Sequence, residues 1–262
     1  MTIISLNIAN YDDHPNWEKR KIEIFGTLIM FPPDIICLQE VRFNPQQPSC
    51  RNSYQNAAEE LLSLMQKAGF FTSSSIITSP AMFYPDNYSC PSLEDNVIWE
   101  GKSIITSRNI LEHGNYFLTR PEDSTDKNRR SIFWCRMQTG SGELVCANLH
   151  WGLDEAGRLS NARETALFAE RFADTPLVII GDFNCDPDGV PHQILSLAGL
   201  RDVWLRNYPD KPGYTFPAEK PRHRYDQVWV NDHLFGSMSG PYVVSRGYMS
   251  DHKALMVDLN ID

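Results

Sequence analysis

The chain has 262 residues, of which 42% are hydrophobic, 22% charged and 11% aromatic, and these are ordinary values for a globular protein with a sizeable core. No stretch reaches the roughly 20 consecutive apolar residues that span a bilayer, which excludes a transmembrane helix. The net charge of −9 argues against tight non-specific binding of nucleic acid, which depends on many Lys and Arg contacts with phosphates, but it leaves open a nuclease with a locally basic cleft.

Short, often β-branched apolar runs alternate with helical patterns along the chain, and this alternation predicts a mixed α/β protein. In chain order we expect a strand at residues 3–9, a helix at 16–30, a strand at 34–38, a helix at 56–67, strands at 74–78, 103–106, 131–138 and 144–149, a helix at 155–172, a strand at 177–180, a helix at 191–198, and strands at 225–230, 242–245 and 254–259.

Three irregular stretches, at residues 44–56, 79–99 and 206–224, are rich in Pro, Asn, Ser and aromatic residues. Loops this long are typical of binding or gating. The aromatic residues of 79–99 could stack on a base, a sugar or a lipid headgroup, or could form a hydrophobic cluster beneath the loop. No repeat or Gly/Ser-rich linker marks a boundary, so we expect one domain over residues 1–262.

The six cysteines are too few for a disulfide scaffold, and none has the CxxC spacing of a structural zinc site. We expect Cys37, Cys135 and Cys146 to be buried, because they lie inside apolar or alternating runs. Cys50 and Cys90 lie in loops and could pair in an oxidising compartment. The first residues, MTIISLNIAN, lack the cationic and apolar segments of a secretory signal, so we expect a cytoplasmic protein.

Acids, amides and histidines gather at the ends of the predicted strands. Each of them alone has an ordinary explanation, such as a surface acid, a turn or a hydrogen-bonded loop residue. In open α/β sheets, however, strand ends bring side chains from distant segments into one cleft. The combination therefore predicts a shared site, formed by Asn7, Glu40, His150, Asp182, Asn184, Asp226, Asp251 and His252.

These segments together resemble the endonuclease/exonuclease/phosphatase superfamily, which has the deoxyribonuclease-I-like fold. The matching segments follow the family order over nearly the whole chain: SLNI at 5–8, LQEV at 38–41, GKSIITSR at 101–108, NLH at 148–150, GDFN at 181–184, RYD at 224–226 and SDH at 250–252. GDFN and SDH are weak signals alone, whereas the ordered set is specific. Tyr225 and Gln227 depart from the R-I-D-Y pattern of many members, but the acid is kept.

The resemblance implies an α/β four-layer sandwich, in which two mixed β-sheets pack face to face with helices on the outside. It implies Mg²⁺ as the cofactor, with Mn²⁺ as an open alternative, because the donor set has carboxylate and amide oxygens but no clustered Cys or His. Glu40 is expected as the main ligand, Asn7 as a second oxygen or as an orienting group, and Asp251 as the residue that completes this side. Asp182 is expected to activate the attacking water and Asn184 to hold the phosphoryl oxygen.

Two histidines are expected to donate hydrogen bonds to the phosphate. The resemblance implies that Asp226 aligns His252, because a carboxylate fixes the imidazole tautomer. Glu100, which precedes GKSIITSR, is expected to align His150. Further contacts with substrate are expected from Arg129, Arg130, Arg224 and Trp151, for which a solvated basic face or a core aromatic residue is the ordinary alternative.

The expected function is metal-dependent hydrolysis of a phosphate ester or phosphodiester, such as a nucleotide, a sugar phosphate or a phospholipid headgroup, by in-line attack of an activated water. A DNA or RNA nuclease of the same fold is the alternative, disfavoured by the net charge. A catalytically inactive binding module is a third hypothesis, although such a module is expected to have lost Glu40, Asp182 or His252. The sequence indicates no protein partner.

Overall fold

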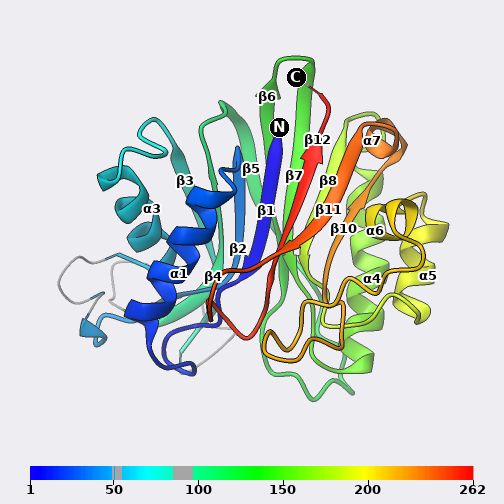
Figure 1. Ribbon diagram of the computed structural model, residues 1–262. Helices are drawn as coiled ribbons and strands as arrows, with labels where there is room; N and C mark the ends of the chain where they lie inside the picture. The colour runs from blue at the N-terminus through cyan, green and yellow to red at the C-terminus, as the bar shows by residue number, and fades with distance from the viewer. Residues whose placement is uncertain (49, 51–54, 85–96, 262) are drawn as a thin grey trace.

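Two six-stranded β-sheets pack face to face and carry helices on their outer sides, as the computed structural model shows for residues 1–48, 50, 55–84 and 97–261 (Figure 1). The predicted α/β four-layer sandwich is therefore confirmed. Helices α1 (Trp17–Met30) and α3 (Ala57–Lys67) lie on the side of the first sheet, and α4 (Glu155–Glu170), α5 (Val190–Leu197), α6 (Val203–Asn207) and α7 (Asp232–Phe235) lie on the side of the second.

The first sheet has the strand order β11-β12-β1-β2-β4-β3. Its strands are β11 (Met238–Val244), β12 (Ala254–Leu259), β1 (Thr2–Asn7), β2 (Ile35–Phe43), β4 (Trp99–Thr106) and β3 (Ser75–Phe83). Only β1 and β2 run parallel among these neighbours, so the sheet is mixed and both strands end at the same edge.

The second sheet has the order β5-β6-β7-β8-β10-β9. Its strands are β5 (Ile110–Phe117), β6 (Ser131–Thr139), β7 (Gly142–His150), β8 (Leu177–Asp182), β10 (Asp226–Val230) and β9 (Arg201–Asp202). β7 and β8 run parallel, and β10 runs antiparallel to β8, so that Asp226 lies opposite Asp182 at the end of the sheet.

Three buried hydrophobic clusters hold the layers together. Successive residues of the central strands face opposite layers: Ile3 and Ile35 pack between the sheets, whereas Ile4 and Ile36 pack under α1 and α3. A third cluster lies between the second sheet and α4 and α5. Because both faces of these strands are buried, their sequences are continuous apolar runs, as is typical of strands covered on both sides.

Gly181 allows the second sheet to close tightly beside the site. Its φ is +149°, and a Cβ at this position would lie 2.2 Å from the carbonyl oxygen of Leu149. Only glycine fits such a close approach of two backbones. β7 and β8 therefore end side by side, and this brings His150 opposite Asp182.

The structure changes several predicted boundaries. β3 and β4 extend into the stretch 79–99 that was expected to be irregular, and β2 continues to Phe43. Strands β5 and β9 and helices α6 and α7 were not predicted. Cys37, Cys135 and Cys146 are buried as expected, whereas Cys90, and with it the proposed pair with Cys50, lies outside the described residues. Within the described ranges, no helix is long and apolar enough to cross a membrane.

Candidate active site

Most of the predicted site residues line one cleft at the end of the two sheets where β1, β7 and β8 finish. Asp226 lies behind this cleft, in contact with His252. The predicted residues that line the cleft are Asn7, Glu40, Glu100, Arg130, His150, Asp182, Asn184, Asp251 and His252. Segments more than 200 residues apart in the sequence therefore meet in one site, as the strand ends predicted.

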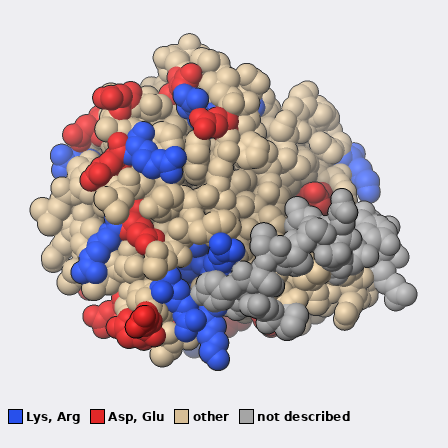
Figure 2. All heavy atoms as spheres, turned by 180° about the vertical axis from the view of Figure 1, so that it is seen from behind, with Lys and Arg blue, Asp and Glu red and all other residues tan. Residues whose placement is uncertain are grey.

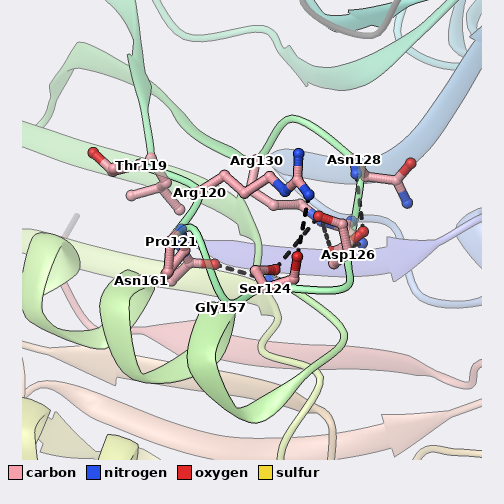
Figure 3. A pocket seen from close by; sticks show the side chains of 11 residues that line it. Thr119, Arg120, Pro121, Ser124, Asp126, Asn128, Arg130, Gly157 and Asn161 are labelled. Atoms are coloured by element: carbon pink, nitrogen blue, oxygen red, sulfur yellow. Dashed lines mark hydrogen bonds and ion pairs between the residues drawn. The ribbon is translucent and has the colours of Figure 1, made fainter.

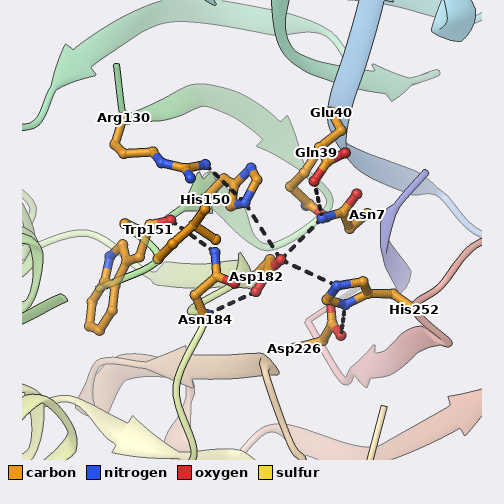
Figure 4. Close-up of polar contacts among 12 residues, drawn as sticks. Asn7, Gln39, Glu40, Arg130, His150, Trp151, Asp182, Asn184, Asp226 and His252 are labelled. Carbon is orange, nitrogen blue, oxygen red and sulfur yellow. Dashed lines mark hydrogen bonds and ion pairs between the residues drawn. The ribbon is translucent and has the colours of Figure 1, made fainter. Parts of the chain in front are cut away.

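Asn7 bridges two carboxylates at the centre of the cleft (Figure 4). Its amide nitrogen donates to Glu40 Oε1 at 2.9 Å and to Asp182 Oδ2 at 3.1 Å. Its amide oxygen accepts from the backbone N–H of Ala9 at 3.0 Å. Because the oxygen is used in this way and the nitrogen faces the acids, the contacts favour the orienting role of Asn7 over that of a ligand.

Glu40 reaches the cleft from an irregular point inside β2. The pairing of β2 with β4 shifts register between Leu38 and Val41, and Glu40 adopts a φ of +55°. A bulge of this kind redirects a side chain, and a non-glycine residue with positive φ is common at functional sites. The backbone N–H of Asn10 donates to Glu40 Oε2 at 3.2 Å, which holds the carboxylate in place.

Asp182 is 1% exposed and lies between the two histidines. Its Oδ2 is 3.6 Å from His150 Nε2 and 3.6 Å from His252 Nε2. Its Oδ1 accepts from the backbone N–H of Asn184 at 2.8 Å. Burial raises the pKa of Asp182 to about 6, although the neighbouring His252 lowers it. A buried carboxylate with a raised pKa is a stronger base than an exposed one.

His252 is held by a buried carboxylate, as predicted. Its Nδ1 lies 2.8 Å from Asp226 Oδ2, and Asp226 is fully buried. Burial alone would lower the pKa of His252, but Asp226 and Asp182 outweigh it and raise this pKa to about 10. The ring therefore carries a proton at neutral pH. Phe216 packs against it with ring centroids 4.7 Å apart.

The predicted alignment of His150 by Glu100 is wrong. Glu100 Oε2 instead accepts from Arg42 at 2.7 Å, while His150 Nε2 lies 3.0 Å from a terminal nitrogen of Arg130. Burial and then the charge of Arg130 lower the pKa of His150 well below its ordinary value. Arg can only donate, so its contact with Nε2 leaves the single proton of the neutral ring on Nδ1.

Three of the residues expected to contact substrate lie outside the cleft. The guanidinium of Arg129 is 3.6 Å from the ring centroid of Phe117. Arg224 is 2% exposed and donates to both oxygens of Asp202, at 3.0 and 2.6 Å, so it serves the core rather than a substrate. Trp151 is fully buried, and its indole N–H donates to Thr165 at 3.1 Å, as in the alternative of a core aromatic residue.

The remaining predicted residues fit the cleft with local support. Asp251 Oδ1 accepts from the hydroxyl of Ser250 at 3.1 Å. Asn184 has a φ of +51°, and its amide donates to the carbonyl of Trp151 at 2.9 Å. Sequence analysis missed seven other lining residues, of which Tyr84 and Phe216 lie in stretches expected to form binding loops; the seven are Asn10, Asp13, His14, Tyr84, Asn128, Leu153 and Phe216.

Comparisons with known proteins agree with this fold. Residues 4–252 match the model of the Endonuclease/Exonuclease/phosphatase family. Mouse Nocturnin is 24% identical over 94% of this chain and 59% of its own length, and the chain spans about three fifths of the curated relatives that head the matches. Among solved structures, a family protein from Leptotrichia buccalis superposes with a TM-score of 0.78, at 18% identity over 99% of each chain. A mannosyl-6-phosphatase from Bacteroides thetaiotaomicron gives 0.68, at 19% identity over 99% of each chain.

Proposed function

The chain belongs to the Endonuclease/Exonuclease/phosphatase family, and on that basis we propose that it hydrolyses a phosphate ester or phosphodiester with a divalent metal ion bound in the cleft. The observation that carries this proposal is the Asn7 bridge, which holds the Glu40 carboxylate next to the buried base Asp182. A mannosyl-6-phosphatase with the same fold supports a phosphate-ester substrate.

The residues around Glu40 suit a hard cation that keeps much of its own water. Glu40 and Asp251 offer carboxylate oxygens to the cleft. In the part of the chain that the structure describes, no group of three or more His, Cys, Asp or Glu side chains could hold a metal ion. Mg²⁺ fits such a sparse set because it is bound through one or two carboxylates and retains several waters, and Mn²⁺ accepts the same donors. Such an ion would stabilise the charge that develops on the phosphoryl and leaving oxygens.

The chain's own residues supply the proton transfer and the remaining charge. Asp182 takes a proton from the attacking water, which its raised pKa and its buried position favour. His252, protonated and held by Asp226, donates to a phosphoryl oxygen. Arg130 brings a permanent positive charge to the opposite wall of the cleft, beside the neutral His150. Asn184 lies next to Asp182 and is proposed to hold a phosphoryl oxygen.

The lining of the cleft favours a small ester over a nucleic acid. Among the described residues that line it, Arg130 is the only Arg or Lys. On the face seen in Figure 2, a run of Lys and Arg side chains lies at the lower centre, and the other Lys and Arg side chains lie among Asp and Glu side chains. Tracking of a nucleic acid depends on many phosphate contacts, so the single Arg or Lys among the described lining residues disfavours a nuclease.

The proposal is tested with a panel of phosphomonoesters, a phosphodiester, sphingomyelin, supercoiled plasmid and a single-stranded oligonucleotide. Hydrolysis of at least one ester should stop in EDTA and return with Mg²⁺. Asp182→Asn should lower kcat by about 10²–10⁴ without loss of folding, because the base is lost. The matched control is Asp123→Asn, an exposed acid away from the cleft. Full activity in chelator, or an Asp182→Asn variant as active as the control, would reject the mechanism.

A further inference from the structure

Residues 118–130 form the loop that joins β5 to β6, and the loop lies beside the start of α4 (Figure 3). Arg130, at the end of this loop, lines the cleft. Asp154, the N-cap of α4, accepts from the backbone N–H of Gly157 at 2.8 Å. The same carboxylate also accepts from three residues of the loop: Ser124 Oγ at 3.0 Å, Thr125 Oγ1 at 2.9 Å and the backbone N–H of Asp126 at 2.9 Å. One side chain thus caps a helix and anchors the loop.

Asp126, in the anchored loop, binds the guanidinium of Arg130. Its Oδ2 accepts from Arg130 Nε at 2.9 Å and lies 2.8 Å from a terminal nitrogen of the same guanidinium. It also accepts from the backbone N–H of Leu153 at 3.0 Å, while Oδ1 accepts from the N–H of Asn128 at 2.9 Å. The Asp126 side chain is only 4% exposed and does not line the cleft, although it borders a smaller pocket that Arg130 also lines (Figure 3).

Arg130 is therefore held from two sides, since its other terminal nitrogen lies 3.0 Å from His150 Nε2. The guanidinium has more N–H groups than these contacts use, and the residue lines the cleft. An unrestrained Arg would lose side-chain entropy on binding an anion. For Arg130 this side-chain entropy is already lost when the protein folds, so it is not lost again on binding. A pre-organised site gains affinity in this way.

We infer that Asp126 is a positioning residue, which orients Arg130 for contact with a phosphoryl group, and that Asp154 anchors the loop carrying both. The inference rests on the proposed function only for the identity of the ligand as a phosphoryl group. It assigns a role to an acid that no matching motif contains.

The inference is tested by the binding of inorganic phosphate, measured by calorimetry in the presence of Mg²⁺. Asp126→Asn keeps the shape of the side chain but removes its charge, so the Kd for phosphate should rise about tenfold, since hydrogen bonds to a charged group are stronger than neutral ones. Arg130→Gln should raise Kd further. Asp126→Asn should then add nothing in the Arg130→Gln background, because the inferred effect of Asp126 on phosphate binding is exerted through Arg130. Asp123→Asn, in the same loop, is the control and should bind as the wild type does.

Asp126→Glu covers the case in which Asp126→Asn does not fold, because it keeps the charge and moves it by one methylene; it should give an intermediate Kd. The inference would be overturned if Asp126→Asn raised the Kd for phosphate by the same factor in the wild-type and the Arg130→Gln backgrounds. It would also be overturned if the Kd of Asp126→Asn equalled that of Asp123→Asn. A wild type that does not bind phosphate would overturn it as well. If no ester of the panel is hydrolysed, the proposed function is rejected. The inference is tested separately, since phosphate binding is measured without turnover.

Discussion

Removal of the Asp226 charge should shift the pH dependence of the reaction in a defined direction. Asp226 lies 2.8 Å from His252 and is the larger of the carboxylate effects that raise its pKa to about 10. A hydrogen bond to a charged group contributes about 1.5–3 kcal/mol, and one pKa unit corresponds to about 1.36 kcal/mol. Asp226→Asn should therefore lower the pKa of His252 by about 1–2 units, to about 8–9.

The pH profile of kcat/KM reports this change directly. The proposed mechanism requires Asp182 deprotonated and His252 protonated, so the wild-type profile should rise near pH 6 and fall near pH 10. In Asp226→Asn the alkaline limb should move to lower pH by about 1–2 pH units, while the rate near neutral pH changes little. The acid limb should also move down, because the charge of Asp226 raises the pKa of Asp182. The pKa values read from the two limbs are apparent values of an interacting set of groups. The reasoning requires both limbs to move to lower pH.

A matched control exists elsewhere in the chain. His223 Nδ1 lies 2.6 Å from Asp186 Oδ2, which is a second His–Asp pair of similar geometry outside the cleft. Asp186→Asn should leave both limbs in place. NMR titration of the His252 ring gives an independent value of its pKa. An alkaline limb unmoved in Asp226→Asn, or moved equally in Asp186→Asn, would refute the assignment of His252 as the protonated donor.

Two further substitutions separate the metal side of the cleft from the core. Glu40→Gln removes the carboxylate expected to bind the ion, so the Mg²⁺ concentration for half-maximal activity should rise at least about tenfold; a Mg²⁺ titration that matches the wild type would contradict this role. Arg224→Met leaves Asp202 buried without its cation, so the free energy of unfolding should fall by about 3–5 kcal/mol in urea titration, while kcat/KM of the folded enzyme stays within about twofold. A large loss of kcat/KM at unchanged stability would restore the substrate role first expected of Arg224.

The core strands could be predicted because their physical signal is local. β1, β8 and β12 are short apolar runs, and all three were expected within two residues of their observed bounds. β5 was missed because it is an edge strand, and every residue of its sequence ILEHGNYF is half-buried or exposed. β2 was cut short because Gln39, Glu40 and Arg42 interrupt its apolar pattern, although the bulge places Glu40 at the cleft.

The sequence indicated nine of the residues that line the cleft, but not several of their partners. Strand ends and motifs indicated His150 and Glu100, since both depend on short segments of sequence. Their actual partners, Arg130 and Arg42, depend on how a loop and a neighbouring strand pack in three dimensions. No spacing along the chain encodes such a contact, and a carboxylate expected from spacing alone was therefore paired with the wrong side chain.

These partners explain why two histidines in one cleft carry different charges. His252 faces carboxylates, which keep its ring protonated, whereas burial and then the charge of Arg130 leave the His150 ring neutral. Asp182 lies 3.6 Å from both rings, and the positive charge of His252 limits how far burial raises its pKa. A base at neutral pH must be ionised and yet hold a proton well. The asymmetry between the two histidines meets both requirements, because one cation keeps Asp182 ionised while the neutral ring adds no second charge to weaken it as a base.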